Sequence, residues 1–312
     1  GLSSILCGYS STKFTLFINL SILGLFCSIY HPAGISWVVN TAKNTGRALG
    51  FNNIFGGVGI GLGALLAGIL IDQYSWHAAF ILPGLISLLI GIALVWHIQS
   101  SQISLKNIVS EKFSENPERS QYLKIAIIML ISITCLSFVF QILQTSLPKT
   151  IDIRLSSSMD LSTSEIGYIV SAIYIVSGLM NYVGGILADK FSEKIIYAIG
   201  IIGQGCLLLL IISLSNYLLI VLCLIIVAFN SSILPAENLL LARFAPEKYQ
   251  SLVYGIKFII SFSVGPIALI LISKSYELTN EFSYLYLTSG VIMLLLFMVV
   301  LTLPVKKQAL AA

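Results

Sequence analysis

Long apolar runs, separated by short polar turns, fill almost the whole chain. A helix that crosses a bilayer needs about 20 mostly apolar residues. Residues 1–8 are apolar but too short to cross alone, so they are expected to be the end of a further span whose beginning is absent. Nine runs are long enough to be predicted as membrane-spanning helices: residues 13–42, 46–70, 77–98, 124–147, 164–188, 195–214, 217–242, 250–273 and 283–304.

The composition agrees with a membrane protein. Hydrophobic residues make up 57% of the chain and charged residues 10%, whereas a soluble domain carries roughly 25% charged residues. The mean hydropathy is +0.97. The five cysteines stand singly, without the spacing of a metal site, and the chain has no Walker loop, H-E-x-x-H or G-x-S-x-G motif. We therefore expect no cofactor, no metal, no nucleic-acid partner and no enzyme activity.

Positive charges gather at one set of predicted helix ends, and the richer ends are predicted to be cytoplasmic. Twelve cations lie at these ends: Lys43, Arg47, Lys106, Lys112, Arg119, Lys124, Lys190, Lys194, Arg243, Lys248, Lys306 and Lys307. Four lie at the opposite ends: Lys13, Lys149, Arg154 and Lys274. The prediction is a multi-pass protein of the cell (inner) membrane with a cytoplasmic C-terminus.

The two parts of the chain repeat each other. The run SIYHPAG at 28–34 matches SSILPAE at 231–237, which aligns Pro32 with Pro235. The later part has six predicted spans and the earlier part has three plus the short stub, so the first two spans and most of the third are expected to be missing. Four segments are predicted: the remainder of an N-terminal half at 1–98, a cytoplasmic linker at 99–123, a C-terminal six-span half at 124–304 and a cytoplasmic tail at 305–312.

One charged turn, GGILADKFSEK at 184–194, lies between two predicted spans. It matches the signature Gly-x-Leu-Ala-Asp-Arg/Lys-x-Gly-x-Arg/Lys of the major facilitator superfamily of membrane transporters, except that Ser192 stands where the family prefers Gly. The matching residues are Gly185, Leu187, Ala188, Asp189, Lys190 and Lys194. The chain thus resembles this superfamily, which implies an all-α membrane bundle of two pseudo-repeated halves that rock about a midplane site.

The resemblance also implies a role for the turn. In this family the equivalent turn packs against the cytoplasmic end of a helix from the other half, which here is the start of the 46–70 helix near Arg47. Asp189 would then act as a latch that forms in one access state and breaks in the other. The alternative is a solvated turn that only fixes topology. SIYHPAG is also similar to the fosmidomycin-resistance branch of efflux proteins, but it is too short to assign a substrate.

Polar groups inside predicted spans are candidates for substrate or proton binding, because each is costly in hydrocarbon. His31 can exchange a proton near neutral pH, or it can hydrogen-bond the helical turn that Pro32 breaks. Glu237 and Lys257 are expected to form a structural ion pair, with a coupling-ion or anionic-substrate site as the alternative. Further hydrogen-bonding candidates are Asn19, Asn181 and Asn230.

Small residues and prolines mark helix packing. Gly57, Gly61 and Gly68 share one smooth face of the 46–70 helix, where small residues let helix backbones approach closely in lipid. That face is expected either to pack against a neighbour or to form a sliding seam between the halves. The other expected packing positions are Pro32, Pro235, Gly265 and Pro266.

We therefore expect a secondary active transporter of a small solute that works by alternating access in the lipid bilayer, with a proton or other coupling ion. One alternative is a solute–cation symporter that imports a nutrient. The other is a non-transporting membrane sensor or a defective truncated fragment.

Overall fold

The structure is a computed structural model that describes residues 1–100, 119–155, 161 and 163–304. Over these residues the chain forms helices joined by turns, without a strand. The helices are α1 Leu2–Gly8, α2 Lys13–Thr41, α3 Thr45–Gln73, α4 Ala78–Ser100, α5 Arg119–Leu155, α6 Thr163–Lys190, α7 Glu193–Leu210, η1 Ile211–Ser213, α8 Leu218–Phe244, η2 Glu247–Tyr249, α9 Gln250–Ser263, α10 Gly265–Thr279 and α11 Ser283–Val300. The predicted tail at 305–312 and most of the predicted linker at 99–123 lie outside the described residues.

The predicted spans are confirmed in number, because nine stretches of the described chain are long and apolar enough to cross a membrane. Two boundaries were wrong. The loop expected from residue 148 is helical up to Leu155, since α5 continues through Pro148 and its last turns bury Thr150 and Arg154. The 250–273 run is interrupted at Val264, where α9 ends and α10 begins with Pro266 in its first turn. Proline lacks an N–H and fits the first turn of a helix.

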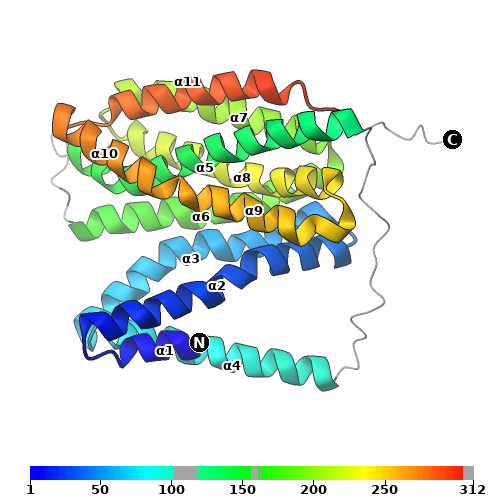
Figure 1. Ribbon diagram of the computed structural model, residues 1–312. Coiled ribbons are helices and arrows are strands. Elements are labelled where there is room, and N and C mark those ends of the chain that lie inside the picture. Colours follow the sequence, from blue (N-terminus) through cyan, green and yellow to red (C-terminus); the bar gives the residue numbers. More distant parts are fainter. Residues whose placement is uncertain (101–118, 156–160, 162, 305–312) are drawn as a thin grey trace.

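The helices form two groups, α1–α4 and α5–α11 (Figure 1). Within the second group, α6 and α7 pack on α8, and α7 also packs on α11. The two groups meet where α3 lies along α6 and where α2 lies against α9. These two contacts position the candidate site.

The bundle has two ends, which we call the Asp189 end and the Lys13 end. The Asp189 end holds the end of α2 and the start of α3, and α2 begins at the Lys13 end. The buried residues of α2 are Ile35, Ser36 and Val39, all in its part near the Asp189 end. There Ser251 Oγ of α9 donates to Ser36 Oγ at 3.1 Å. Contact between α2 and the second group is therefore concentrated at the Asp189 end.

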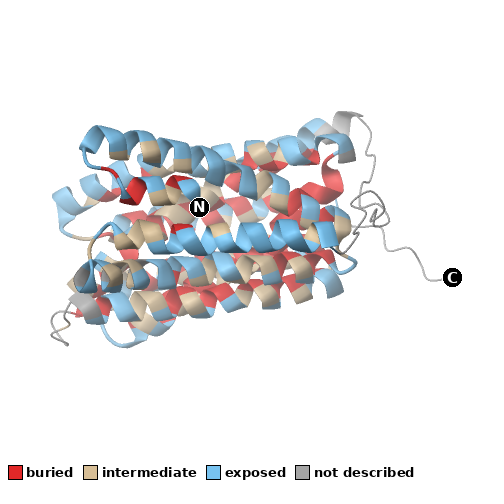
Figure 2. Ribbon diagram, turned by 90° about the horizontal axis from the view of Figure 1, so that it is seen from below, coloured by how far each residue is buried: buried red, intermediate tan, exposed pale blue. Residues whose placement is uncertain are grey.

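The outside of the bundle is apolar. Exposed residues cover its outer surface and buried residues lie between helices (Figure 2). Many exposed side chains are large and hydrophobic, such as Leu89, Ile90 and Ile92 of α4. A soluble protein rarely exposes so large a contiguous apolar surface. The surface and the nine spans together define an integral, multi-pass membrane protein.

Candidate functional site

A cavity of about 600 Å³ lies between the two helix groups. Helices α2 and α3 form one wall, and α5, α6, α8 and α9 form the other. Its polar lining residues are Tyr30, His31, Asn52, Asn53, Ser137, Gln141, Tyr174, Ser177, Asn181, Asn230, Ser231, Glu237, Asn238, Lys257 and Ser261. Because both groups contribute, a movement of one group against the other would reshape the cavity.

A buried ion pair forms part of the wall. Lys257 Nζ of α9 pairs with the Glu237 carboxylate of α8 and donates to Asn238 Oδ1 at 2.7 Å. Tyr197 Oη donates to Glu237 Oε2 at 3.1 Å, and it bonds Ser132 Oγ at 2.6 Å. Buried charges need such partners because leaving one unpaired is strongly destabilising. The structure thus contains the ion pair that the sequence predicted.

His31 joins the two groups through its ring. It stacks on Phe258 of α9, with ring centroids 4.3 Å apart and planes 25° apart. Tyr30 meets the His31 ring edge-on and donates its hydroxyl to Asn52 Oδ1 of α3 at 2.8 Å. In the described chain, His31 makes no hydrogen bond to the turn that Pro32 breaks. The structure therefore places His31 at the contact between α2 and α9.

The predicted amides separate into two groups. Asn181 and Asn230 line the cavity. Asn19 does not, because its Nδ2 donates to Leu6 O at 2.9 Å and to Ser10 Oγ at 3.0 Å and so ties α2 to the region of α1. Asn52 and Asn53 line the cavity but were missed. The signal that could have found them is a pair of adjacent amides inside an apolar span, which is costly without a polar partner.

Asp189 contacts the first turn of α3. Its Oδ1 accepts from the Gly46 N–H and its Oδ2 from the Arg47 N–H, both at 2.7 Å. The Arg47 side chain turns elsewhere, since its Nε donates to Tyr182 Oη at 2.7 Å. A carboxylate at a helix N-terminus pairs with free N–H groups and with the positive end of the helix dipole. The carboxylate thus links the last turn of α6 to the other helix group.

Glycines permit the close crossing of α3 and α6. A Cβ atom on Gly185 would collide with the Gly46 carbonyl oxygen, and one on Gly57 would collide with Gly178. A Cβ atom on Gly61 would lie 2.9 Å from the Ser171 carbonyl oxygen. The surroundings of Gly68 lie outside the described residues. The smooth face of α3 therefore packs on α6 at Gly57 and Gly61.

The remaining predicted positions do not line the cavity. Lys194 Nζ donates to the carbonyls of Leu301 and Leu303, at 2.7 and 2.5 Å, and so holds the end of α11. Lys190 is exposed. A Cβ atom on Gly265 would lie 3.2 Å from Gln141 Nε2, so α10 begins close to α5. Pro32 and Pro235 lie inside α2 and α8.

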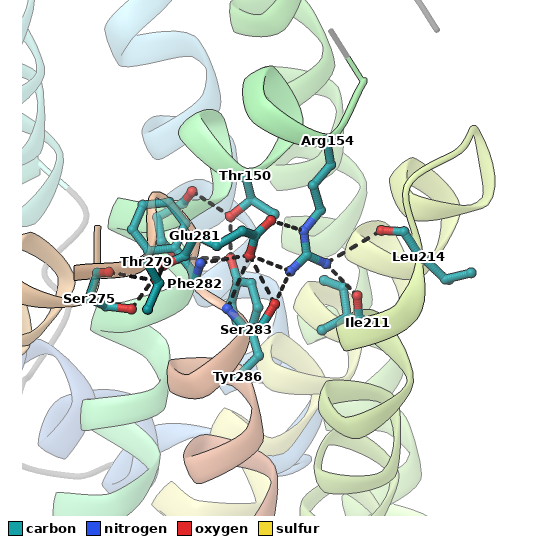
Figure 3. Close-up of polar contacts among 11 residues, drawn as sticks. Thr150, Arg154, Ile211, Leu214, Ser275, Thr279, Glu281, Phe282, Ser283 and Tyr286 are labelled. Atoms are coloured by element: carbon teal, nitrogen blue, oxygen red, sulfur yellow. Dashed lines mark hydrogen bonds and ion pairs between the residues drawn. The ribbon is translucent and has the colours of Figure 1, made fainter. Parts of the chain in front are cut away.

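Figure 3 shows a second polar cluster, which the sequence did not predict. It lies at the Lys13 end, where α5 ends and α11 begins. Arg154 of α5 donates through Nε and Nη2 to the two Glu281 oxygens, at 2.6 and 2.8 Å. Its Nη1 donates to the carbonyl of Ile211. Glu281 also accepts the N–H of Phe282 at 2.7 Å. The cluster therefore fastens α5, η1 and the start of α11 together.

We expect Glu281→Gln to lower the free energy of unfolding at pH 7 by roughly 2–4 kcal/mol, because it strands a buried guanidinium. Hydrogen bonds from Arg154 lower the pKa of Glu281 to about 2. The ionised Glu281 carboxylate therefore contributes its full stabilisation of the folded protein above pH 4.5, the pKa of the unfolded chain. This stabilisation is lost as the pH falls toward 2. The difference between wild type and variant should shrink over that range when unfolding is measured in detergent.

The control for this prediction is Asp152→Asn. Asp152 pairs with Lys149 on the same helix, but both side chains are at least 40% exposed. An exposed pair contributes about 0–1 kcal/mol. A loss in Glu281→Gln no larger than that of Asp152→Asn would contradict the role given to the cluster.

The fold and the cavity define a multi-pass helical membrane protein with a solute-sized cavity between two helix groups. The family model of the Major Facilitator Superfamily matches the chain twice, over residues 1–159 and 130–311. The chain therefore belongs to the Major Facilitator Superfamily, which is a family of transporters rather than enzymes.

Solved structures agree on the fold. The human organic anion transporter MFSD10 (TETRAN) is 13% identical, with a TM-score of 0.69, and the match covers 96% of this chain and 74% of that one. The transporter FucP, in the outward conformation, is 13% identical, with a TM-score of 0.66 and coverage of 96% and 79%. A variant of the E. coli fucose:proton symporter FucP is 12% identical, with a TM-score of 0.68 and coverage of 96% and 81%. No curated protein matches the sequence significantly.

Proposed function

We propose that this protein is a secondary transporter that moves a small solute by alternating access, with a proton as the coupling ion. The observation that carries the proposal is the cavity of about 600 Å³ whose walls come from both helix groups. The positive-inside bias of the sequence predicts that the Asp189 end is cytoplasmic. Since α2 meets α9 at that end, we infer a conformation in which the cavity is closed toward the cytoplasm and opens toward the opposite side.

The similar structures leave the solute and direction open. MFSD10 is an organic anion transporter and FucP is a fucose:proton symporter, so solute class differs among proteins of this fold. FucP was solved in the outward conformation, which agrees with the access proposed here. A nutrient-importing symporter is the second candidate, and a membrane sensor that does not transport is the third. An observation of alternating access would distinguish the two transporter candidates from the sensor, because a sensor does not need to open its cavity to both sides of the membrane.

Access to the cavity tests the proposal without knowledge of the solute. A reporter, Asn53→Cys, is placed in protein whose five native cysteines are replaced. In vesicles, an impermeant thiol reagent should label residue 53 from both sides, because the cavity opens to each side in turn. Labelling is read by mass spectrometry of the peptide that contains residue 53.

A crosslink provides the matched control. The Oγ atoms of Ser36 and Ser251 are 3.1 Å apart, so the variant Ser36→Cys/Ser251→Cys would bring two thiols close together, and their oxidation to a disulfide is the crosslink. With this disulfide, labelling at residue 53 should remain from the non-cytoplasmic side and disappear from the cytoplasmic side. Reduction should restore it. Labelling from a single side before crosslinking would exclude alternating access and favour a sensor.

We expect His31→Gln to flatten the pH profile of transport, because an imidazole can bind and release a proton and a glutamine side chain cannot. His31 faces Lys257 and Phe258 of α9, and Lys257 is paired with Glu237 of α8. Uptake into proteoliposomes at a series of pH values measures the profile. Phe262→Leu, which alters the same aromatic cluster without removing a titratable group, should keep the profile. An unchanged profile in His31→Gln would reduce His31 to a packing residue.

A further inference from the structure

The charges of the cavity wall cancel. Glu237 and Lys257 are the charged residues among those that line the cavity, and they pair with each other. Each is at most 5% exposed, and each has a further hydrogen-bond partner, Tyr197 or Asn238. A charged solute would enter this site without a free counter-charge from these residues, and burying an unpaired ion is costly. The wall therefore favours an uncharged solute.

The amides of the cavity have unused hydrogen-bonding capacity. Asn181 is 2% exposed, and its Oδ1 has no hydrogen-bond partner in the described part of the chain. Asn53, Gln141 and Asn230 also line the cavity and make no hydrogen bond to another described residue. An orphaned carbonyl oxygen needs a donor, and the NH₂ groups need acceptors. A hydroxyl group can both donate and accept a hydrogen bond, whereas a carboxylate can only accept one.

Aromatic rings form a platform beside these amides. His31 stacks on Phe258 at 4.3 Å, and Phe258 stacks on Phe262 at 6.0 Å. All three rings line the cavity. The negative face of an aromatic ring attracts partly positive hydrogens, such as the C–H groups on one face of a pyranose ring. The wall thus combines an apolar platform with groups that match hydroxyls.

We propose that the cavity binds an uncharged monosaccharide, with the ring face on the His31–Phe258–Phe262 platform and hydroxyls on Asn181 and the neighbouring amides. This inference rests on the proposed transport function and specifies its solute class. The opposite arrangement, an anionic or cationic solute that opens the Glu237–Lys257 pair, is an outcome of the test below.

Matched probes isolate the effect of charge. Glucose and galactose are compared with glucuronate and glucosamine, which keep the ring and add a negative or a positive charge. Binding to the purified full chain in detergent is measured as thermal stabilisation over a concentration series. We expect a neutral hexose to bind, and its charged analogues to bind at least about tenfold more weakly, a difference of about 1.4 kcal/mol in binding free energy. Equal or tighter binding of a charged analogue would overturn the proposal, as would binding of uridine but of no hexose.

Amide variants test the contacts. Asn181→Ala and Gln141→Ala should each raise the Kd for the hexose about tenfold. Asn216→Ala, which changes an exposed amide in the turn before α8, should leave it unchanged. Asn181 is buried, so Gln141→Ala remains informative if Asn181→Ala folds poorly. Wild-type affinity in a folded Gln141→Ala or Asn181→Ala protein would contradict the binding mode.

A charge variant gives a signature that a structural role would not produce. Glu237→Gln frees the Lys257 ammonium and should shift preference toward glucuronate, whereas Glu237→Gln/Lys257→Met restores neutrality and should keep preference for the neutral hexose. Absence of this shift in folded protein would overturn the charge argument. If residue 53 labels from both sides but no hexose binds, transport stands and the solute class is wrong.

Discussion

Glu237→Gln and Lys257→Met are each expected to lower the free energy of unfolding by roughly 3–5 kcal/mol, because each strands a buried charge. Each of the two residues is at most 5% exposed, and the ion pair joins α8 to α9 beside the cavity. In Glu237→Gln the ammonium keeps Asn238 but loses its counter-ion. In Lys257→Met the Glu237 carboxylate keeps the Tyr197 hydroxyl but loses its counter-ion.

The double variant Glu237→Gln/Lys257→Met should lose much less than the sum of the two single variants. Replacing both members of a buried pair removes the stranded charge, and such replacements are often close to neutral. The measurement is a double-mutant cycle on unfolding in detergent, with an interaction term of about 2 kcal/mol or more expected for groups in contact. Additive losses would mean that the two charges do not interact in the folded protein.

Gly185→Ala is expected to separate α3 from α6 and to weaken the Asp189 contact. The added Cβ would collide with the Gly46 carbonyl oxygen, which is backbone and cannot swing away. Overpacking of this kind costs typically 1–3 kcal/mol. Since Asp189 lies one helical turn beyond Gly185 and accepts from Gly46 and Arg47, the distance between these groups should grow. The thiol assay on residue 53 should then report more labelling from the cytoplasmic side.

Gly167→Ala is the matched control. Gly167 lies in the same helix and a Cβ there meets no atom within 4 Å, so the change should be neutral or slightly stabilising, because Ala favours helix over Gly by about 1 kcal/mol. Asp189→Asn isolates the charge without the steric effect and should shift labelling in the same direction as Gly185→Ala. Wild-type labelling in both Gly185→Ala and Asp189→Asn would leave the turn as a marker of topology.

The spans could be predicted from sequence because they depend on local chemistry. In lipid each backbone polar group must be satisfied within its own helix, so a run of about 20 apolar residues suffices to identify a span. The two boundary errors came from proline. Pro148 did not end α5, whereas Pro266 did coincide with a break. Whether a helix continues past proline depends on the contacts of the following residues, such as Arg154, and those contacts are not visible in the sequence.

The candidate site could be predicted only in part. Because polar side chains inside apolar spans are costly in hydrocarbon, the sequence indicated His31, Asn181, Glu237 and Lys257 as candidates. The fold brings all four to one cavity. The same rule also selected Asn19, which the structure places against Leu6 and Ser10 instead. The rule recognises that a polar group needs a partner, but it cannot tell a neighbouring helix from a solute.

The sequence by itself therefore determined the membrane class, the helices, the family signature around Asp189 and the residues that need polar partners. The tertiary structure decided which partners they have. The Gly46 and Arg47 N–H groups, rather than the Arg47 side chain, meet Asp189, and Phe258 covers His31. The physical reason is that hydropathy is a property of each segment, whereas the rotation and crossing of helices are set by the packing of many side chains at once.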